Sequence, residues 1–250
     1  MIVIKTAREI RQMQAACKLS ARALRLAGEA IEPGVSTLEI DTLVRKFIEE
    51  QGATPSFLGY GGFPASTCIS VNNVVIHGIP SKKIILKEGD IVSVDVGAYL
   101  NGYHGDNAYT FACGDISKEA RALLDATKES LYEGIKMAVA GNRVGDISAA
   151  VQEYTEARSY SVVRDFVGHG VGAKLHEEPS VPNFGTPHRG ARLIPGMTLA
   201  IEPMINMGSY DVEVLSDEWT VVTADSSLSA HFEHTIAVTP DGPMIMTLPD

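Results

Sequence analysis

The sequence is poor in cysteine and has no hydrophobic run long enough to cross a membrane. Its three cysteines, Cys17, Cys68 and Cys113, are scattered and form no CxxC pair. This argues against a disulfide framework and against a structural zinc site. The first residues also lack the pattern of a signal peptide. Because there is neither a signal peptide nor an apolar span of about 20 residues, we expect a cytoplasmic protein.

Basic residues are scarce as well. The chain has 21 Lys and Arg against 31 Asp and Glu, which gives a formal net charge of −10. This balance argues against nucleic acid as the main partner and favours neutral or cationic ligands. The hydrophobic content of 45% is ordinary, and no low-complexity segment or linker divides the 250 residues. We therefore expect residues 1–250 to form a single domain with a sizeable core.

Helical and strand signals follow one another along the chain. Two helices begin with capping boxes, Thr6-Ala-Arg-Glu9 and Ser36-Thr-Leu-Glu39, which satisfy free amides at a helix start. Glycine and proline between apolar runs predict strands over residues 55–115. Four prolines and three glycines predict a surface loop over residues 178–196. The predicted helices cover residues 6–30, 36–51, 117–140 and 146–159.

The stretch VDVGAYLNGYHGD, residues 94–106, reads as a β-hairpin. Asn-Gly between apolar residues is the strongest short signal for a two-residue turn. Pairing Leu100 with Tyr103 across the turn puts Asp95 opposite Ala108. Asp106 is then a diagonal neighbour of Asp95 on the same face, about 7–8 Å away at the backbone. The hairpin therefore holds two carboxylates side by side, unless the register slips by one residue.

The order of helices and strands repeats, and so does the sequence. At an offset of 107 residues, segment 34–50 aligns with 141–157, and segment 86–95 aligns with 193–202. The second match sets Asp95 on Glu202. With about 20 inserted residues, HGDNAYTF aligns with HFEHTIAV and sets Asp106 on Glu233. The internal repeat, approximately 34–115 and 141–240, predicts two α+β halves related by a pseudo-twofold axis.

If these halves pack sheet to sheet about that axis, the four acids converge. Four ionised carboxylates in an apolar pocket repel each other and are costly to desolvate. They can share protons, pair with Arg or Lys, or bind metal. No Arg or Lys lies within three residues of Asp95, Asp106 or Glu233. We therefore predict two divalent ions about 3.5–4 Å apart, bridged by carboxylates. The alternative, four separate solvated acids, does not explain their repeat-related positions.

Histidines add a softer ligand and candidate hydrogen-bond donors. VGHGVGAKLHEEP carries His169 and His176, and VIHGIP carries His77 in a similar local sequence. An imidazole ligand favours Mn, Fe, Co or Zn over Mg or Ca. His104 and His231 also match in the repeat, and spacing alone does not exclude them. The remaining two, His188 and His234, are interpreted as ordinary loop and off-face residues.

Such a pair of ions points to metal-assisted hydrolysis. It lowers the pKa of a bridging water, so that hydroxide is available near neutral pH. The same ions can anchor a substrate amine or oxygen and polarise the scissile carbonyl. Free histidines nearby can donate hydrogen bonds to the tetrahedral intermediate.

Around these residues lie the motifs HGIP, GHGVG, HEEP, IEPM and FEHT. With them, the sequence resembles the type I methionine aminopeptidases over essentially the whole chain. The resemblance implies an α+β pita-bread fold, with helices packed outside a central curved antiparallel sheet. It also implies that Asp95 chelates one ion and that Asp106 and Glu233 bridge both. His169 and Glu202 complete the other metal site.

The same resemblance implies roles for residues around the metals. Glu202 is a candidate proton shuttle, His77 acts near the scissile nitrogen, and His176 contacts the substrate carbonyl. A thioether packs well against aromatic rings, and the methionine pocket corresponds to Tyr60, Phe63, Cys68 and Trp219.

Two positions depart from a common bacterial pattern of this pocket. Phe57 stands where a small residue is frequent, and its bulk predicts a narrower pocket. Leu175 stands where an aromatic residue is frequent, which predicts a wider opposite wall. The chemistry is unaffected by either change, but the shape of the pocket is expected to differ.

The resemblance implies removal of the initiator methionine from nascent proteins when the second residue is small and uncharged, with a bridging hydroxide attacking the scissile carbonyl. The cofactor would be two divalent ions, and Co, Mn, Fe(II), Zn or Ni all fit the ligand set. We expect a monomer in the cytoplasm that associates transiently with the ribosome, and no membrane partner. The spacing of His169 and Glu202 and the short N-terminus are those of a minimal bacterial form.

Three other interpretations remain. A proline-directed aminopeptidase or dipeptidase of the same fold usually has an additional N-terminal domain, and here the catalytic domain begins almost at residue 1. A binding protein that has lost catalysis would lack metal ligands, and this chain has all five. A dinuclear phosphoesterase would need basic residues near the acids to hold a phosphate, and none are found.

Overall fold

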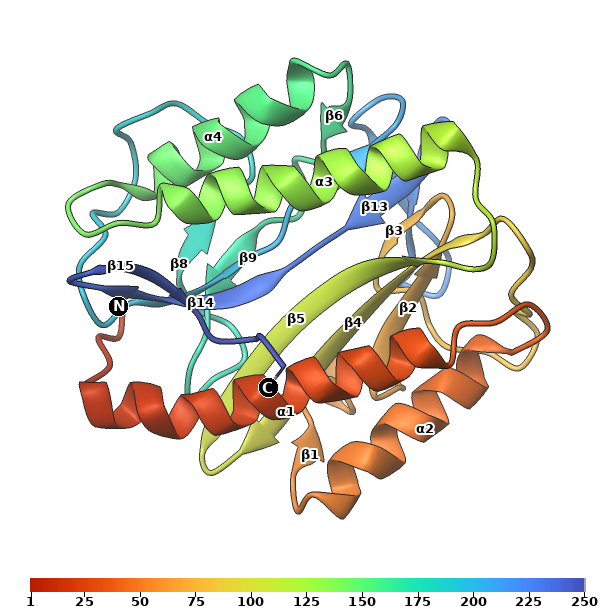
Figure 1. Cartoon of the computed structure of the whole chain (residues 1–250), viewed down its shortest axis with the longest axis horizontal. Coiled ribbons are helices and arrows are strands. Elements are labelled where there is room, and N and C mark those ends of the chain that lie inside the picture. Colours follow the sequence, from red (N-terminus) through yellow and green to blue (C-terminus); the bar gives the residue numbers. More distant parts are fainter. Residues whose placement is uncertain (250) are drawn as a thin grey trace.

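Two pairs of helices enclose the strands in a computed structural model that describes residues 1–249. Helices α1 and α2 cover one side, α3 and α4 cover the other, and the strands lie between them (Figure 1). The four α-helices of the described residues are α1 (Ala7–Glu29), α2 (Thr37–Glu50), α3 (Lys118–Lys136) and α4 (Val144–Glu156), with a short 3₁₀ helix, η1 (Tyr60–Gly62).

All paired strands are antiparallel in this part of the chain. One sheet carries the N-terminal half of the site, with β4 between β1 and β2, and β5 also paired to β4. Its members are β1 (Thr54–Pro55), β2 (Thr67–Val71), β4 (Ile91–Leu100) and β5 (Tyr103–Ala112).

A five-stranded sheet of order β15-β14-β9-β7-β8 carries the C-terminal half. Its members are β7 (Gly168–Gly170), β8 (Glu177–Val181), β9 (Thr198–Ile201), β14 (His234–Thr239) and β15 (Gly242–Ile245). Two smaller sheets contain β3 (Val74–Ile76), β6 (Ser161–Val162), β10 (Met204–Asn206), β11 (Val212–Val214), β12 (Val221–Thr223) and β13 (Ser229–His231).

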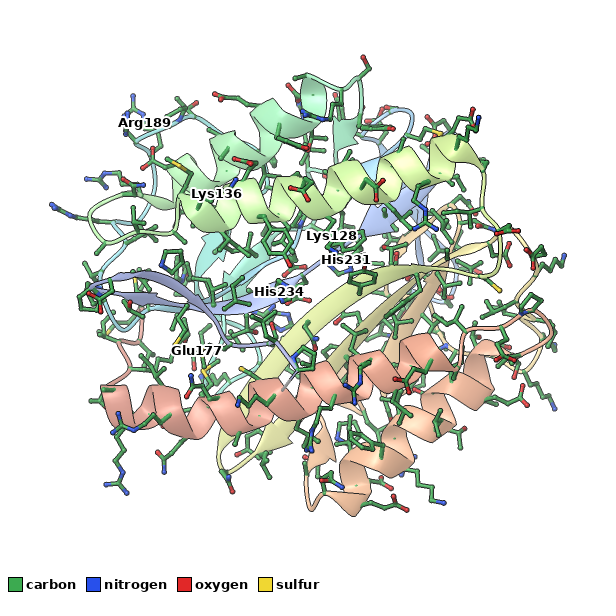
Figure 2. The ribbon with its side chains drawn as sticks, viewed as in Figure 1. Lys128, Lys136, Glu177, Arg189, His231 and His234 are labelled. Atoms are coloured by element: carbon green, nitrogen blue, oxygen red, sulfur yellow. The ribbon has the colours of Figure 1, made fainter. Side chains whose placement is uncertain are left out.

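Helices α1 and α2 begin where their capping boxes predict. The Thr6 and Ser36 side chains each accept the amide three residues later, and Glu9 and Glu39 accept the amides of Thr6 and Ser36 in return. On the outer face of α3, Lys136 pairs with Glu133 at 2.6 Å and points to solvent (Figure 2). Such exposed pairs contribute little to stability, because water screens them.

The two C-terminal helices differ from their predicted ranges. Helix α3 ends at Lys136, four residues earlier than predicted, and a turn follows that contains Gly141 at φ +100°. Helix α4 begins at Val144 rather than Asp146. The reason is that Asp146 occupies the third helical position, from which its carboxylate accepts the amide of Arg143 at 2.7 Å.

The prediction of a continuous surface loop over residues 178–196 is wrong in its first part. Residues Glu177–Val181 form β8, which pairs with β7 at the edge of the five-stranded sheet. Pro179 favours a loop in the sequence, but proline is tolerated on an edge strand, where one side of the backbone needs no partner. The strand brings His176, just before it, next to β7.

The hairpin has the predicted register. Leu100 pairs with Tyr103 and Asp95 pairs with Ala108, while Asp106 pairs with Gly97. The turn residues Asn101 and Gly102 both have positive φ, +55° and +86°, as a tight turn that follows the twist of the strands requires. Asp95 and Asp106 therefore lie on one face of the sheet.

The same local joint occurs twice, 107 residues apart. Gly34 donates its amide to the carbonyl of Leu86 at 2.8 Å, and Gly141 donates to that of Leu193 at 2.9 Å. Both glycines have φ near +100°, which side chains rarely tolerate. Isolated bridges add Ser36 with Ile85 and Arg143 with Arg192. Each joint ties the start of a helix to the segment that leads into a central strand.

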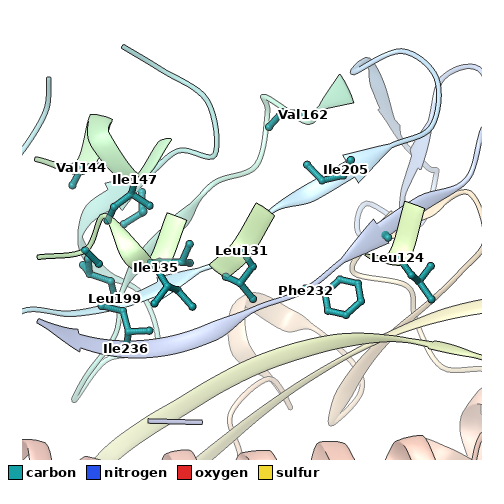
Figure 3. Packing of buried hydrophobic residues seen from close by; sticks show 14 of the residues in the cluster. Leu124, Leu131, Ile135, Val144, Ile147, Val162, Leu199, Ile205, Phe232 and Ile236 are labelled. Carbon is teal, nitrogen blue, oxygen red and sulfur yellow. The ribbon is translucent and has the colours of Figure 1, made fainter. Parts of the chain in front are cut away.

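Each helix pair buries its own hydrophobic cluster against the sheets. Leu131 and Ile135 of α3 and Ile147 of α4 pack with residues of the neighbouring strands, including Leu199 and Ile236 (Figure 3). A second cluster joins α1 and α2 to β4 and includes Leu24, Ile40, Val44, Val92 and Val94. Burial on this scale anchors the strands that carry the acids. Within residues 1–249, no helix combines the length and the apolar character needed to cross a membrane.

One buried carboxylate fixes β2 against α2. Oδ1 of Asp41 accepts the amides of Ser66 and Thr67 and the Thr67 hydroxyl, each at 2.9 Å. We expect Asp41→Ala to lower the free energy of unfolding by about 1–3 kcal/mol, because it leaves buried donors without an acceptor. Asp41→Asn keeps an oxygen acceptor and should lose less. Urea unfolding measures both, and equal stability of Asp41→Ala and wild type would contradict this reading.

Candidate metal centre and substrate pocket

A cavity of about 220 Å³ lies where the two halves meet. Strands β4 and β5 from the first half and segments at β7, β9 and β14 from the second contribute to its wall. Every residue that the sequence singled out for catalysis, metal binding or substrate binding lines it: Tyr60, Phe63, Cys68, His77, Asp95, Asp106, His169, His176, Glu202, Trp219 and Glu233.

The acids come from four places in the chain. Asp95 lies on β4 and Asp106 on β5, Glu202 follows β9 directly, and Glu233 lies between β13 and β14. Asp106, His169 and Glu233 each offer a ligand atom, and these atoms all lie within 4.8 Å of one another. Nε2 of His169 is 3.5 Å from Oε1 of Glu202 and 3.9 Å from Oδ2 of Asp106.

Backbone and hydroxyl contacts lock the two halves together beside these acids. The Thr235 hydroxyl donates to the carbonyl oxygen of Asp106 at 2.7 Å, and the Asp106 amide lies 3.2 Å from the same hydroxyl. The amide of Glu233 donates to the carbonyl of Ala108 at 2.9 Å. These contacts therefore fix the position of Asp106 relative to that of Glu233.

Several oxygens of this cluster have no protein partner. Asp95 Oδ1, Asp106 Oδ1 and Glu233 Oε1 are buried and accept no hydrogen bond in the described structure. Among residues 1–249, no lysine or arginine lines the cavity, so a basic side chain does not neutralise the acids. Buried carboxylates need a compensating charge or proton. A donor set of carboxylate oxygens with one imidazole fits divalent transition metals.

Burial raises the pKa of each acid. For Asp95 and Glu233, loss of water is the largest cause, and the charge of Asp106 adds to it. Burial raises the pKa of Glu202 in the same way, again with Asp106 second. The pKa of Asp106 rises to about 7, mainly through desolvation. Without a cation, the cluster therefore holds protons that it would lose in water.

His169 presents a free ring nitrogen to the acids. Its Nδ1 lies 2.8 Å from the carbonyl oxygen of Gly170, which can only accept, so Nδ1 carries the hydrogen and the lone pair lies on Nε2. Burial, with a smaller contribution from the nearby His176, lowers the pKa of His169 to about 3. A neutral imidazole with its lone pair directed into the cluster is the form that binds a metal.

His77 and His176 both belong to the cavity wall. His77 has φ +57°, an uncommon backbone conformation for a non-glycine residue, and its ring packs edge-on against Phe166 and Trp219. Nδ1 of His176 is 2.7 Å from the Tyr60 hydroxyl, and its ring centre is 4.2 Å from that of His169. Both side chains can reach a molecule bound in the cavity.

The wall away from the acids is apolar. Phe57, Phe63, Cys68 and Leu175 are buried and pack together with Trp219, whose ring centre lies 5.1 Å from that of Phe63. Burial raises the pKa of the Cys68 thiol well above its usual range, so this sulfur acts as an apolar group. The cavity thus combines the cluster of acids with a pocket suited to an apolar side chain.

Sequence reasoning missed four residues of the wall: Gly61, Ile76, Phe166 and Val167. Ile76 and Val167 are near neighbours of His77 and His169 in the chain, so local proximity was an available signal. No such signal existed in the sequence for the contact of Phe166 with His77, because this contact joins segments about ninety residues apart.

The remaining histidines lie outside the cavity lining. Buried His231 has its Nε2 3.9 Å from Oε2 of Glu202. His104 contacts the Ser56 hydroxyl, His234 contacts that of Thr247, and exposed His188 lies beside Asp146. Of the two histidines that match in the repeat, His104 and His231, it is His231 that approaches an acid of the cluster. His231 and His234 are labelled in Figure 2.

Comparison with known proteins places these residues in a family context. A methionine aminopeptidase of Clostridium acetobutylicum is 55% identical over 99% of each chain, and methionine aminopeptidase 1 of Bacillus subtilis is 52% identical over 99% of each. The crystal structure of methionine aminopeptidase from Thermotoga maritima matches with a TM-score of 0.97 at 48% identity, covering 99% of both chains.

A prolidase from Pyrococcus horikoshii matches with a TM-score of 0.80 at 23% identity, covering all of this chain and 65% of that one, which shows the shared fold. These likenesses confirm the predicted α+β pita-bread fold. The model of metallopeptidase family M24 matches residues 11–240. With that match and relatives more than 50% identical over almost its whole length, the chain belongs to metallopeptidase family M24.

Proposed function

We propose that this chain is a methionyl aminopeptidase, which hydrolyses the first peptide bond of proteins that begin with methionine and continue with a small, uncharged residue. The observation that carries the proposal is one cavity in which a carboxylate and imidazole cluster adjoins an apolar pocket. The relatives named methionine aminopeptidase support the same activity.

We further propose that residues 1–250 act as one catalytic domain built from two related halves, approximately 34–115 and 141–240. The paired joints at Gly34 and Gly141 support this organisation. Each half contributes two acids to the cavity, so neither half alone would have the complete set of side chains.

The residues that would hold two divalent ions are Asp95, Asp106, His169, Glu202 and Glu233. Mn, Fe(II), Co, Ni and Zn all suit this set. When bound, such ions supply Lewis acidity and make a water molecule acidic enough to serve as the nucleophile.

The chain's own residues would bind and orient the peptide. The side chain of the first methionine would lie among Phe63, Cys68 and Trp219, where a thioether gains contact with aromatic rings. The carbonyl of the scissile bond would accept a hydrogen bond from His176, which the Tyr60 hydroxyl orients. This contact would stabilise negative charge as it develops on that oxygen.

Proton transfer is assigned to the remaining groups. Glu202 would take a proton from the attacking water, because its carboxylate lines the cavity beside His169 and would lie next to that water. His77 would lie near the scissile nitrogen, held by its contacts with Phe166 and Trp219. The protein would work as a monomer in the cytoplasm, on chains that emerge from the ribosome.

An Xaa-Pro peptidase is the second candidate, because a prolidase shares the fold. The two functions differ in the first side chain and in the second residue. The apolar pocket beside the acids favours the first function, and a peptide panel distinguishes them, as described below.

Metal binding is expected to stabilise the fold measurably. Mn²⁺ at 100 times its dissociation constant should add about 2.7 kcal/mol to the free energy of unfolding of metal-stripped protein. Asp106→Asn should lose most of this gain, and Asp106→Ala should abolish activity with little loss of fold. Asp125→Asn, an exposed acid on α3, is the matched control and should keep the full gain. An undiminished metal response or full activity in the Asp106 variants would show that Asp106 does not bind the ions.

Substrate choice can be read from short peptides. With Mn, Co or Fe(II), the protein should release methionine from Met-Ala-Ser but not from Met-Lys-Ser. Chromatography of free methionine measures both reactions. A preference for Xaa-Pro peptides would support the second candidate, and no methionine release with any divalent ion, at intact fold, would remove the enzyme assignment.

Pocket shape is expected to depend on Phe57. Its ring lies so close to β4 that a Cβ at Gly97 would be 2.8 Å from Cε1, so strand and ring fit only because Gly97 has no side chain. Phe57→Ala should lower kcat/KM for Met-Ala-Ser by roughly 10- to 100-fold, since a loosened apolar pocket loses contact with the methionine. The kcat/KM of Phe57→Leu should lie between the values of wild type and Phe57→Ala. Unchanged kcat/KM in Phe57→Ala would show that the ring does not shape the pocket.

A further inference from the structure

A buried ion pair lies outside the cavity, between the N-terminal segment and the start of β8. Nζ of Lys5 is 2.5 Å from Oε2 of Glu177, and the two side chains are only 3% and 6% exposed. Neither residue lines the cavity. Glu177 is labelled in Figure 2, and Lys5 precedes α1. Long charged side chains are rarely buried so completely without a specific reason.

The fold makes room for this pair at two glycines. A Cβ on Gly172 would lie 2.6 Å from Oε1 of Glu177 and 2.6 Å from Cε of Lys5. A Cβ on Gly196 would lie 2.6 Å from the carbonyl oxygen of Lys5. The Lys5 amide donates to the carbonyl of Gly196 at 2.8 Å. The N-terminal segment is therefore fitted against the loop and does not lie loosely over it.

The carboxylate of Glu177 closes the loop between β7 and β8. While Oε2 accepts from Lys5, Oε1 accepts the amide of Lys174 at 3.2 Å. Within the loop, the Gly172 amide donates to the carbonyl of Lys174 at 3.0 Å. The Gly172 carbonyl accepts the amide of His104 at 2.8 Å, which ties the loop to β5. One carboxylate thus connects the N-terminal segment to the loop backbone.

This loop carries two residues of the cavity wall. Leu175 and His176 both line the cavity, and His176 immediately precedes Glu177. At the other end of the loop, Gly170 pairs with Glu177 and is adjacent to His169. A change in the position of Glu177 would therefore move both the apolar wall and the His176 ring.

From these contacts we propose that Lys5 is a positioning residue: through Glu177 it fixes the 172–176 loop, and so sets where Leu175 and His176 meet the substrate. The kinetic part of this proposal rests on the proposed aminopeptidase function. The effect of Lys5 on the order of the loop does not depend on that function. Removing the ammonium leaves the buried Glu177 carboxylate without its partner, and the group then turns toward water and releases the Lys174 amide.

The test compares Lys5→Met with Lys136→Met in the full-length, metal-loaded protein. Lys136 also forms a short ion pair with a glutamate, but on exposed α3. Amide hydrogen exchange over residues 171–177 reports loop order without reference to activity. Steady-state kinetics on Met-Ala-Ser report kcat and KM separately.

We expect Lys5→Met to speed exchange over residues 171–177 and to lower kcat/KM by roughly tenfold or more, because a small displacement of substrate-contacting groups is costly to catalysis. Lys136→Met should match wild type in both measurements. Lys5→Arg, which keeps the charge, should restore most of the loop protection and of the activity.

Other results would overturn the proposal. If Lys5→Met lowers only the melting temperature, with wild-type exchange and kinetics where it is folded, Lys5 is merely structural. If Lys5→Met does not fold, Lys5→Met/Glu177→Gln removes both charges, and wild-type loop protection in that variant refutes the role. Absence of cleavage by wild type would instead refute the proposed function, while the exchange experiment still decides the role of Lys5 in the loop.

Discussion

Repulsion among four carboxylates in a poorly hydrated cavity is the constraint on which the structure depends. Water is mostly excluded from Asp95, Asp106, Glu202 and Glu233, and no basic side chain of the described cavity wall offsets their charge. Such a cluster is unfavourable unless protons or cations accompany it. The unpartnered oxygens and the free lone pair of His169 suit a cation.

A cluster of this kind needs a rigid support. The Thr235 hydroxyl and the Ala108 carbonyl connect β5 to the second half next to Asp106 and Glu233. Behind these strands, the two helix pairs bury separate hydrophobic clusters. The burial of apolar side chains at a distance therefore offsets the electrostatic cost at the centre, a division common in enzymes that keep charged groups away from water.

Binding of a substrate would depend on apolar contact rather than on the charge of the acids. On the proposed function, the pocket beside the acids would gain its affinity from contact between a thioether and the walls formed by Phe63, Trp219 and Leu175. Leu175 and His176 share one loop, so the apolar wall and a hydrogen-bond donor move together. On the proposed function, this shared loop would couple recognition of the first side chain to the hydrogen bond that His176 would donate to the carbonyl of the scissile bond.

The sequence by itself determined the hairpin register and the two capping boxes, because turn geometry and helix starts depend on residues close together in the chain. Only the tertiary structure decided that Glu177–Val181 is an edge strand, that Phe166 lines the cavity, and that Lys5 reaches Glu177. These features join segments far apart in sequence, and no local preference encodes which distant partner a buried side chain will meet.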